Sequence, residues 1–543
     1  MTYTAVTFAP VQSFIRASRK LRDLYGSSLL LSHLARALAD DANTRADITV
    51  ISPASTDSSR GVPNVLVIEG DYRKGHAREA LLSSWKKVLE VCRRWVEQEL
   101  PGTPFEWQSS WKACGLHTWE LFHGQGATIK QARQALAVNK QQRDWSVPNW
   151  TGESSTLSSA EAVVWPGMGA VRDPRDLPPG MITEEGRKFL EKLREHRELG
   201  EAFAGVNEEI SITELVKRLI TYPAIAAKAF ATAKDPRPDP KSLIPSRFQD
   251  LSMIARENQA EQAKQSESIV WFMADGDGIG DHLQSLAQKD GEKKALQSFS
   301  QSMRSWAAGL YDLVPVVMEQ QAMVVYAGGD DLFGALHETE PGAHDLNTDH
   351  LWRWLGKFPK IWEQCGQTNL TVSMGLVWAD AKVPQREALQ HAREAEVSAK
   401  ARGKNRFALR LLYASGSHLE WTCPWEWLDP ILSHYTDREG RSLKASPDGH
   451  PPSWRHLAED LQWLQSRQAI AADRTSARST TSGAAKPHPV SEAMLQAYFP
   501  GWKPPRAPEE GEGRTIDQWL LDLGRVMAGL EKHRPKTARG DQR

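Results

Sequence analysis

The chain has 543 residues, of which 40% are hydrophobic and 25% are charged, an ordinary balance for globular domains. At roughly 100–200 residues per domain, this length predicts three or four domains. Lys and Arg number 67 and Asp and Glu number 68, and this near-neutral balance excludes a protein that coats nucleic acid through bulk positive charge, although it leaves room for a local basic patch.

The start of the chain and its cysteines bear on location and metal content. No apolar run has membrane-spanning length, and Tyr3–Phe8 is typical of a strand with no signal peptide before it, so we expect a cytoplasmic protein. The four cysteines are far apart and form no C-x-x-C pair: Cys92, Cys114, Cys365 and Cys423. Neither a zinc site nor a disulfide framework is therefore predicted.

Residues 1–130 predict an α+β domain. Strands are expected at 3–8, 48–51 and 64–68, a helix over 77–99, and two earlier helices separated by Gly26-Ser27-Ser28. This order approaches the β-α-β-β-α-β of a ferredoxin-like domain, with the last strand unplaced. Residues 131–265 predict a mainly helical insertion, with helices over 182–196 and 212–219 and a stiff linker at Asp235–Pro240.

Residues 266–412 repeat the β-α-β-β-α-β order, which suggests an internal duplication. Expected in turn are a strand at 269–274, a helix over about 281–314, a β-hairpin, a helix over 351–365, a strand at 370–378 and a helix over 385–402. Residues 413–543 predict a Trp-rich helical domain with a flexible loop at about 471–489. The fold class is thus α+β, with two ferredoxin-like domains, a helical insertion and a helical C-terminal domain.

The hairpin in residues 323–336 carries Gly328-Gly329-Asp330-Asp331 at its tip. Adjacent carboxylates repel each other unless a cation or strong donors hold them, and hard oxygen ligands suit Mg²⁺ or Mn²⁺. By itself the motif is also ordinary turn chemistry, because Gly and Asp both favour turns. The hairpin is therefore a candidate metal–nucleotide site only if other groups join it.

A second acidic cluster supplies such groups. Asp275-Gly276-Asp277 directly follows an apolar strand, where a carboxylate is costly to bury unless it is paired or coordinated. In a ferredoxin-like sheet the first strand lies beside the middle hairpin, so Asp275, Asp330 and Asp331 are expected to meet around two metal ions. That arrangement suits nucleotidyl transfer.

Basic residues for a triphosphate are predicted at the end of the last helix of this domain. Lys400 and Lys404 belong to Ala399-Lys400-Ala401-Arg402-Gly403-Lys404-Asn405-Arg406, which has no acid within it. The alternative is that these charges only complement the helix dipole, with Gly403 ending the helix.

Together these motifs resemble the palm domains of the Cas10 (Cmr2-like) large subunits of type III CRISPR effector complexes, and the opening at Phe8–Ser32 is similar to the first palm of the type III-B branch. The resemblance implies two nucleotidyl cyclase-type palms, of which only the second is catalytic, that convert ATP to cyclic oligoadenylates on target RNA binding. It implies two Mg²⁺ or Mn²⁺ ions as cofactors and ATP as substrate. The implied partners are a Cmr3-like subunit, a small subunit, crRNA and target RNA, with no membrane.

Carried over residue by residue, the resemblance implies that Asp275, Asp330 and Asp331 bind metal and catalyse. It implies nucleotide contacts by Gly276, Asp277, Gly328, Gly329, Ser373, Lys400 and Lys404. Asp277 has a second interpretation as a cap of the following helix, and Ser373 has one as a plain hydrogen bond within its strand. Arg19, Arg22 and Ser27 of the first palm have either a pocket role or a structural one.

Two departures from the family pattern lead to further expectations. The first palm starts at Met1, and the only His-Asp dipeptide, His344-Asp345, lies in a polar segment, so we expect no HD nuclease activity. Around residues 151–157 there are serines where relatives often place zinc-binding cysteines, so no zinc is expected. The alternatives to an oligoadenylate synthase are a catalytically silent scaffold subunit and, with less support, a diguanylate cyclase-like enzyme.

Overall fold

The computed structural model describes residues 2–54, 61–142, 152–170, 173, 176–200, 203–232, 235, 238, 269–286, 291–337, 346–367, 369–380, 383–445, 449–470, 489–505 and 516–534. The chain forms two compact units. The first comprises Met1–Gln265, Gly280–Ala308 and Val325–Gly329, and the second comprises Ser266–Ile279, Gly309–Val324 and Asp330–Arg543.

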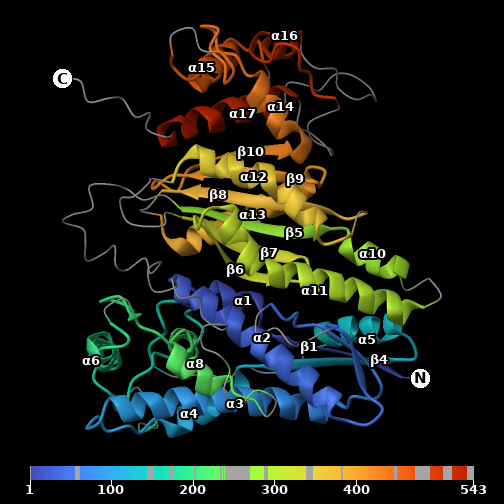
Figure 1. Cartoon of the computed structure of the whole chain (residues 1–543). Helices are drawn as coiled ribbons and strands as arrows, with labels where there is room; N and C mark the ends of the chain where they lie inside the picture. Colours follow the sequence, from blue (N-terminus) through green and yellow to red (C-terminus); the bar gives the residue numbers. More distant parts are fainter. Residues whose placement is uncertain are drawn as a thin grey trace. The chain divides into compact units, whose positions relative to one another are not determined.

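The first unit contains a four-stranded antiparallel sheet in the order β2-β3-β1-β4, formed by β1 (Tyr3–Ala9), β2 (Thr49–Ser52), β3 (Leu66–Glu69) and β4 (Glu120–Gly126). Strands β1 and β4 are labelled in Figure 1. This is the strand order of a ferredoxin-like fold, so that expectation is confirmed, and β4 is the strand that the sequence left unplaced. The accompanying helices are α1 (Gln12–Arg16), α2 (Leu21–Asn43), α3 (Lys74–Glu99), α4 (Gln108–His117) and α5 (Ile129–Gln141).

Helix α2 runs without a break through Gly26-Ser27-Ser28, so the prediction of two helices separated there is wrong. A Cβ atom added to Gly26 would lie 2.0 Å from the carbonyl oxygen of Lys217. The glycine therefore serves the close approach of α7 (Ile212–Leu219) rather than a turn. Ser27 is fully buried and its hydroxyl donates to the carbonyl of Asp23, which gives it a structural role.

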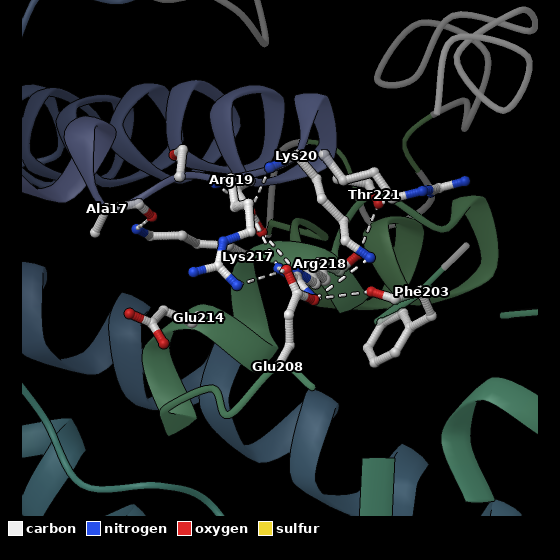
Figure 2. A network of polar contacts seen from close by, with 12 residues as sticks. Ala17, Arg19, Lys20, Phe203, Glu208, Glu214, Lys217, Arg218 and Thr221 are labelled. Atoms are coloured by element: carbon white, nitrogen blue, oxygen red, sulfur yellow. Dashed lines mark hydrogen bonds and ion pairs between the residues drawn. The ribbon is translucent and has the colours of Figure 1, made fainter. Parts of the chain in front are cut away.

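The predicted helical insertion contains α6 (Met181–Glu195), α7 and α8 (Pro223–Ala229). Helix α7 is fastened to α2 by a buried ionic network (Figure 2). The guanidinium of Arg218 is fully buried, with Nε 2.7 Å from Oδ1 of Asp23 and Nη1 2.7 Å from Oε2 of Glu208. Burial would raise the pKa of Glu208, but the charges of Arg218 and Lys20 outweigh it and hold that pKa at about 2.

Two arginines of the first palm differ in their surroundings. Arg22 is buried, its Nη1 donates to Oγ1 of Thr221 at 2.9 Å, and its guanidinium lies 4.6 Å from the ring centre of Tyr222. Arg19 is half-exposed and donates to the carbonyl of Thr156. These contacts favour the structural interpretation of Arg22, because its guanidinium binds Thr221 and Tyr222 of the insertion.

The second sheet has six strands in the order β10-β9-β8-β5-β7-β6 (Figure 1). They are β5 (Ile269–Asp277), β6 (Ala322–Gly328), β7 (Asp331–Leu336), β8 (Thr371–Ala379), β9 (Arg406–Leu412) and β10 (His418–Pro424). Strands β8-β5-β7-β6 repeat the ferredoxin-like order, which confirms that β5 lies beside the hairpin. The sheet also continues past residue 412 into β10, a strand in the region expected to be helical.

Helices of this part are α10 (Ile279–Leu286), α11 (Glu292–Val317), α12 (Thr348–Glu363) and α13 (Gln385–Ala401). The single helix expected over 281–314 is thus two helices. Helix α13 lies along β8, β9 and β5, with Ala395 and Ala399 packed on Ala408 of β9. These small side chains let the helix approach the sheet closely, which brings its C-terminal end to the end of β5.

The C-terminal region follows β10 and contains α14 (Leu428–His434), α15 (Trp454–Ser466), α16 (Pro489–Tyr498) and α17 (Ile516–Leu530), with short 3₁₀ helices at Trp425–Trp427 and Glu531–His533. Helix α17 packs on β10, where the indole of Trp519 donates to the carbonyl of Thr422 at 2.8 Å. Within the described ranges, no helix is long and apolar enough to cross a membrane. The dipeptide His344-Asp345, the loop at 471–488 and most of the Asp235–Pro240 linker lie outside the described residues.

Candidate active site

Strand β5 brings Asp275 to the hairpin. The antiparallel pairing of β5 with β7 ends at Ala274 opposite Leu332, so the next positions in that register are Asp275 and Asp331. The side chain of Asp275 is 31% exposed, which leaves it accessible to a ligand. Because β5 continues to Asp277 along β8, all three residues of the Asp275-Gly276-Asp277 motif are held in extended backbone.

The turn between β6 and β7 brings Asp330 to the same end of the sheet. Strand β6 ends at Gly328 and β7 begins at Asp331. A Cβ atom added to Gly276 would lie 3.0 Å from Cβ of Asp330, so the glycine allows the hairpin to approach β5. Gly329 has φ +70° with open space around it, a conformation that suits glycine. The structure therefore brings Asp275, Asp330 and Asp331 together at the ends of neighbouring strands.

Both hairpin carboxylates have raised pKa values. Desolvation raises the pKa of Asp330, and desolvation together with the like charge of Asp330 raises that of Asp331, although the side chain of Asp331 reaches solvent. Charge repulsion of this kind is relieved when a cation binds between the groups. The residues present thus suit a divalent cation.

A preformed metal cage is nevertheless missing from the described part of the chain, where no three His, Cys, Asp or Glu side chains converge in a way that could hold a metal ion. Mg²⁺ commonly binds through one or two carboxylates, with water and phosphate oxygens completing the coordination. The donor set of Asp275, Asp330 and Asp331 fits that mode of binding rather than a cage built wholly from protein.

Lys400, near the end of α13, reaches the carboxylate of Asp275 at the end of β5. Its Nζ forms ion pairs with Oδ2 of Asp275 and, at 2.9 Å, with Oε1 of Glu396 one turn earlier in the helix. These pairs favour the charged forms, but desolvation dominates: burial and the charge of Asp331 raise the pKa of Glu396 to about 7, and burial lowers that of Lys400 to about 8. Lys400 is thus a partly desolvated cation beside the acidic cluster.

Asp277 points to the opposite neighbour, β8, and is 6% exposed. Its Oδ1 accepts a hydrogen bond from the hydroxyl of Ser373 at 2.8 Å, and its Oδ2 accepts from Thr371 Oγ1 at 2.8 Å and from the amide of Asn405 at 2.9 Å. Ser373 is fully buried. These contacts favour a role in fixing the backbone over direct contact with nucleotide, and they involve no cap of α10.

The amide of Asn405 belongs to the turn that follows α13. Gly403, Lys404 and Asn405 have φ values of 124°, 58° and 48°, and the side chain of Lys404 is exposed. Left-handed backbone is uncommon outside glycine, so a fixed partner is needed to hold it. The hydrogen bond from Asn405 to Asp277 supplies that partner and keeps Lys404 near Lys400, whose pKa its charge also lowers.

Sequence reasoning missed two groups of this site. Glu396 lies four residues before Lys400, a spacing that places both on one helix face and that was available as a signal. Thr371 gave no such signal, because its partner Asp277 is distant in the chain and only the pairing of β5 with β8 brings them together.

Comparison with known protein families agrees with this geometry. Residues 269–408 match the model of the Cas10/Cmr2 second palm domain, and residues 3–88 match that of the N-terminal region of CRISPR-associated protein Cmr2. The chain is Cas10/Cmr2-like. The first match spans β5, the hairpin and α13, which are the elements that carry the acidic cluster and Lys400. The second runs from β1 into the middle of α3 in the first ferredoxin-like domain.

Solved structures resemble this Cas10/Cmr2-like chain at low sequence identity. A chain of a type III-B Cmr-beta complex in its apo state is 10% identical, with a TM-score of 0.53 over 98% of this chain and 82% of that one. The two therefore share a fold. A chain of a Csm1–Csm4 cassette in complex with cA4 is 13% identical, with a TM-score of 0.45 over 97% of this chain and 69% of that one. Among curated proteins, none matches this sequence.

Proposed function

We propose that this chain converts ATP to cyclic oligoadenylates by metal-dependent nucleotidyl transfer, as the large subunit of a cytoplasmic type III CRISPR RNA-guided complex. The observation that carries the proposal is the meeting of Asp275, Asp330 and Asp331 at the ends of neighbouring strands, beside Lys400, within the segment that matches the Cas10/Cmr2 second palm. The proposed partners are a Cmr3-like subunit, a small subunit, crRNA and target RNA.

The residues of the site suit the parts of this reaction. Two Mg²⁺ or Mn²⁺ ions held by the three aspartates would activate the attacking ribose hydroxyl and stabilise the leaving pyrophosphate. Lys400 would leave its carboxylate partners to contact the triphosphate, because a partly desolvated ammonium binds phosphate oxygens strongly. Gly329 has open space where a side chain would be, so that phosphates can approach its backbone. Gly328 instead makes room for the ring of Tyr326, whose hydroxyl oxygen would lie 2.0 Å from a Cβ atom added there.

The proposal is tested on the assembled complex with guide RNA, cognate target RNA, ATP and Mn²⁺ or Mg²⁺. Mass spectrometry of the products should show cyclic oligoadenylates, and their ring size. The double variant Asp330→Asn with Asp331→Asn should assemble normally and make none. Asp312→Asn is the matched control, since Asp312 is an exposed aspartate on α11 of the same unit. Absence of any oligoadenylate from the unmodified complex under all these conditions would refute the proposal.

A silent scaffold subunit is the second candidate, and the lack of a preformed three-ligand cluster among the described residues is the observation that favours it. The two candidates differ in nucleotide binding. A synthase should bind ATP more tightly with Mn²⁺ than with EDTA, whereas a scaffold should show no metal-dependent binding. Isothermal titration of the complex with a non-hydrolysable ATP analogue measures this difference without requiring turnover.

A further inference from the structure

One face of α11 packs on the first ferredoxin-like domain. Leu296 is buried in a cluster with Ile51 and Val67 of the first sheet and Ile129 of α5. Three residues before it, Lys293 forms an ion pair with Glu69. These contacts lie within the first compact unit, which contains residues 280–308 as well as the N-terminal domain. The N-terminal half of α11 is therefore anchored on β2, β3 and α5.

The same helix face holds both described ends of the connection between β2 and β3. The hydroxyl of Ser300 accepts a hydrogen bond from the amide of Ala54 at 3.0 Å. One turn later, Nη1 of Arg304 donates to the carbonyl of Gly61 at 2.8 Å. Arg304 is 5% exposed, so its hydrogen bond to Gly61 is shielded from water. Gly61 is thus fixed relative to α11.

Gly61 in turn lies directly against the hairpin. A Cβ atom added to Gly61 would lie 1.7 Å from the carbonyl oxygen of Ala327, and Gly61 has φ +64°. Both residues belong to the first compact unit. The distance means that the Cα of Gly61 touches the Ala327 carbonyl, a contact of the Cα–H···O type. Ala327 immediately precedes Gly328-Gly329-Asp330-Asp331, so this backbone contact is one residue from the turn.

We propose that Gly61 and Arg304 are positioning residues for the Gly-Gly-Asp-Asp turn: Arg304 holds the first-palm backbone at Gly61 against Ala327 and so sets where the hairpin carries its carboxylates. The inference rests on the proposed function for its kinetic consequence. Its structural content, that Gly61 and Arg304 restrain the backbone at Ala327 within the first unit, stands on the contacts themselves. Neither residue touches substrate, so each acts through the hairpin backbone.

Two variants break this contact from opposite sides. Gly61→Ala places a methyl group on the Ala327 carbonyl, and Arg304→Met keeps an unbranched apolar side chain but removes the guanidinium that donates to Gly61. Gly102→Ala is the matched control: Gly102 has φ +88° and lies in the same unit, but a Cβ there would meet nothing within 4 Å. The control therefore carries the backbone strain of the first variant without its collision.

The kinetic readout separates positioning from binding in the assembled complex. Because small misplacements of catalytic groups are costly, kcat for oligoadenylate formation should fall on the order of 10²-fold in Gly61→Ala while KM for ATP stays within about threefold. Gly102→Ala should retain kcat within about twofold, because it disturbs no contact. Arg304→Met should lower kcat in the same way, and the double variant should lose less than the product of the two single losses, since both break one contact.

Hydrogen exchange of the full chain provides a readout that does not depend on activity. Amides of residues 322–336 should exchange faster in Gly61→Ala and Arg304→Met than in the unmodified chain, and at the unmodified rate in Gly102→Ala. Unchanged exchange of this peptide in both variants would overturn the positioning role even if the complex makes product. A complex that makes no product would instead refute the proposed function, and exchange would still decide the positioning role. If Gly61→Ala fails to fold, Arg304→Met decides the question alone.

Discussion

Replacing Asp277 tests whether this residue fixes the backbone of β5 and β8 or binds metal or nucleotide. Asp277→Asn keeps the shape of the side chain. Its amide oxygen can take the place of Oδ2 and accept from Thr371 and Asn405, while its NH₂ group faces Ser373, whose hydroxyl can turn and accept. All three hydrogen bonds survive in neutral form, so we expect a loss of about 1 kcal/mol of local stability and a turnover within about tenfold of the unmodified complex.

Asp277→Ala leaves three donors without an acceptor. Ser373 is fully buried and cannot turn to water, whereas Thr371 and the Asn405 amide are partly exposed and can recover some hydration. An unsatisfied buried donor costs about 1–3 kcal/mol, so the total should be about 2–4 kcal/mol. Hydrogen exchange of amides in β5 and β8 measures this locally, which a global melt of a chain with several domains does not.

The comparison variant is Asp275→Asn, which alters a predicted metal ligand and the partner of Lys400. It should lower turnover on the order of 10³-fold or more, because metal-ion catalysis contributes several kcal/mol to the transition state. If Asp277→Asn is as inactive as Asp275→Asn while its exchange pattern is intact, Asp277 contacts metal or nucleotide and the positioning interpretation is refuted.

Three further predictions concern the site and the first unit. The raised pKa of Glu396 means that the stability it contributes is present below about pH 4.5 and is lost as the pH rises through about 7. Glu396→Gln should therefore stabilise α13 of the metal-free chain by about 1–3 kcal/mol at pH 8 but not at pH 4.5, measured by hydrogen exchange of α13 amides in the variant and the unmodified chain at each pH. Lys400→Met should lower kcat/KM for ATP by about 10–100-fold, and Lys404→Met should lower it less because Lys404 is exposed. Gly26→Ala should destabilise the first unit by about 1–3 kcal/mol, whereas Gly75→Ala, at an open position of α3, should be neutral or stabilising, as measured by hydrogen exchange of amides in α2 and α3.

The sequence was sufficient to predict the parts of the fold that follow from local pattern and from the ferredoxin-like order. Apolar runs of strand length located β5 and β8, and the glycines and aspartates after Tyr326 located the hairpin. Once the β-α-β-β-α-β order was recognised, the neighbourhood of β5 and β7 followed from topology rather than from any residue. That is why Asp275 and Asp331 could be expected to meet.

What the sequence could not predict depends on contacts between distant residues. Gly26 and the two serines after it form a local pattern that predicts the end of a helix, yet α2 continues through them. The glycine is there because a carbonyl of α7 occupies the space where a side chain would be. Gly61 has no local feature that distinguishes it from other loop glycines. Its proximity to Ala327 is visible only in three dimensions.

The charges of the site bear on how it can work. Four carboxylates, those of Asp275, Asp330, Asp331 and Glu396, lie near one partly buried ammonium, that of Lys400. Desolvation raises the pKa of the hairpin pair and of Glu396, and it lowers the pKa of Lys400. All these shifts favour the neutral forms, because desolvation is the largest cause of each.

A divalent cation would reverse the shifts of the acids by favouring their ionised forms. It would also compete with Lys400 for Asp275, since one carboxylate oxygen cannot hold both at full strength. If the aspartates bind a cation and Lys400 binds phosphate, as proposed, the two events would be coupled through Asp275. The ion pair with Asp275 thus keeps Lys400 beside the site until a cation takes its place. We therefore expect the divalent cation to raise the affinity for the triphosphate, and the triphosphate to raise the affinity for the cation by the same factor.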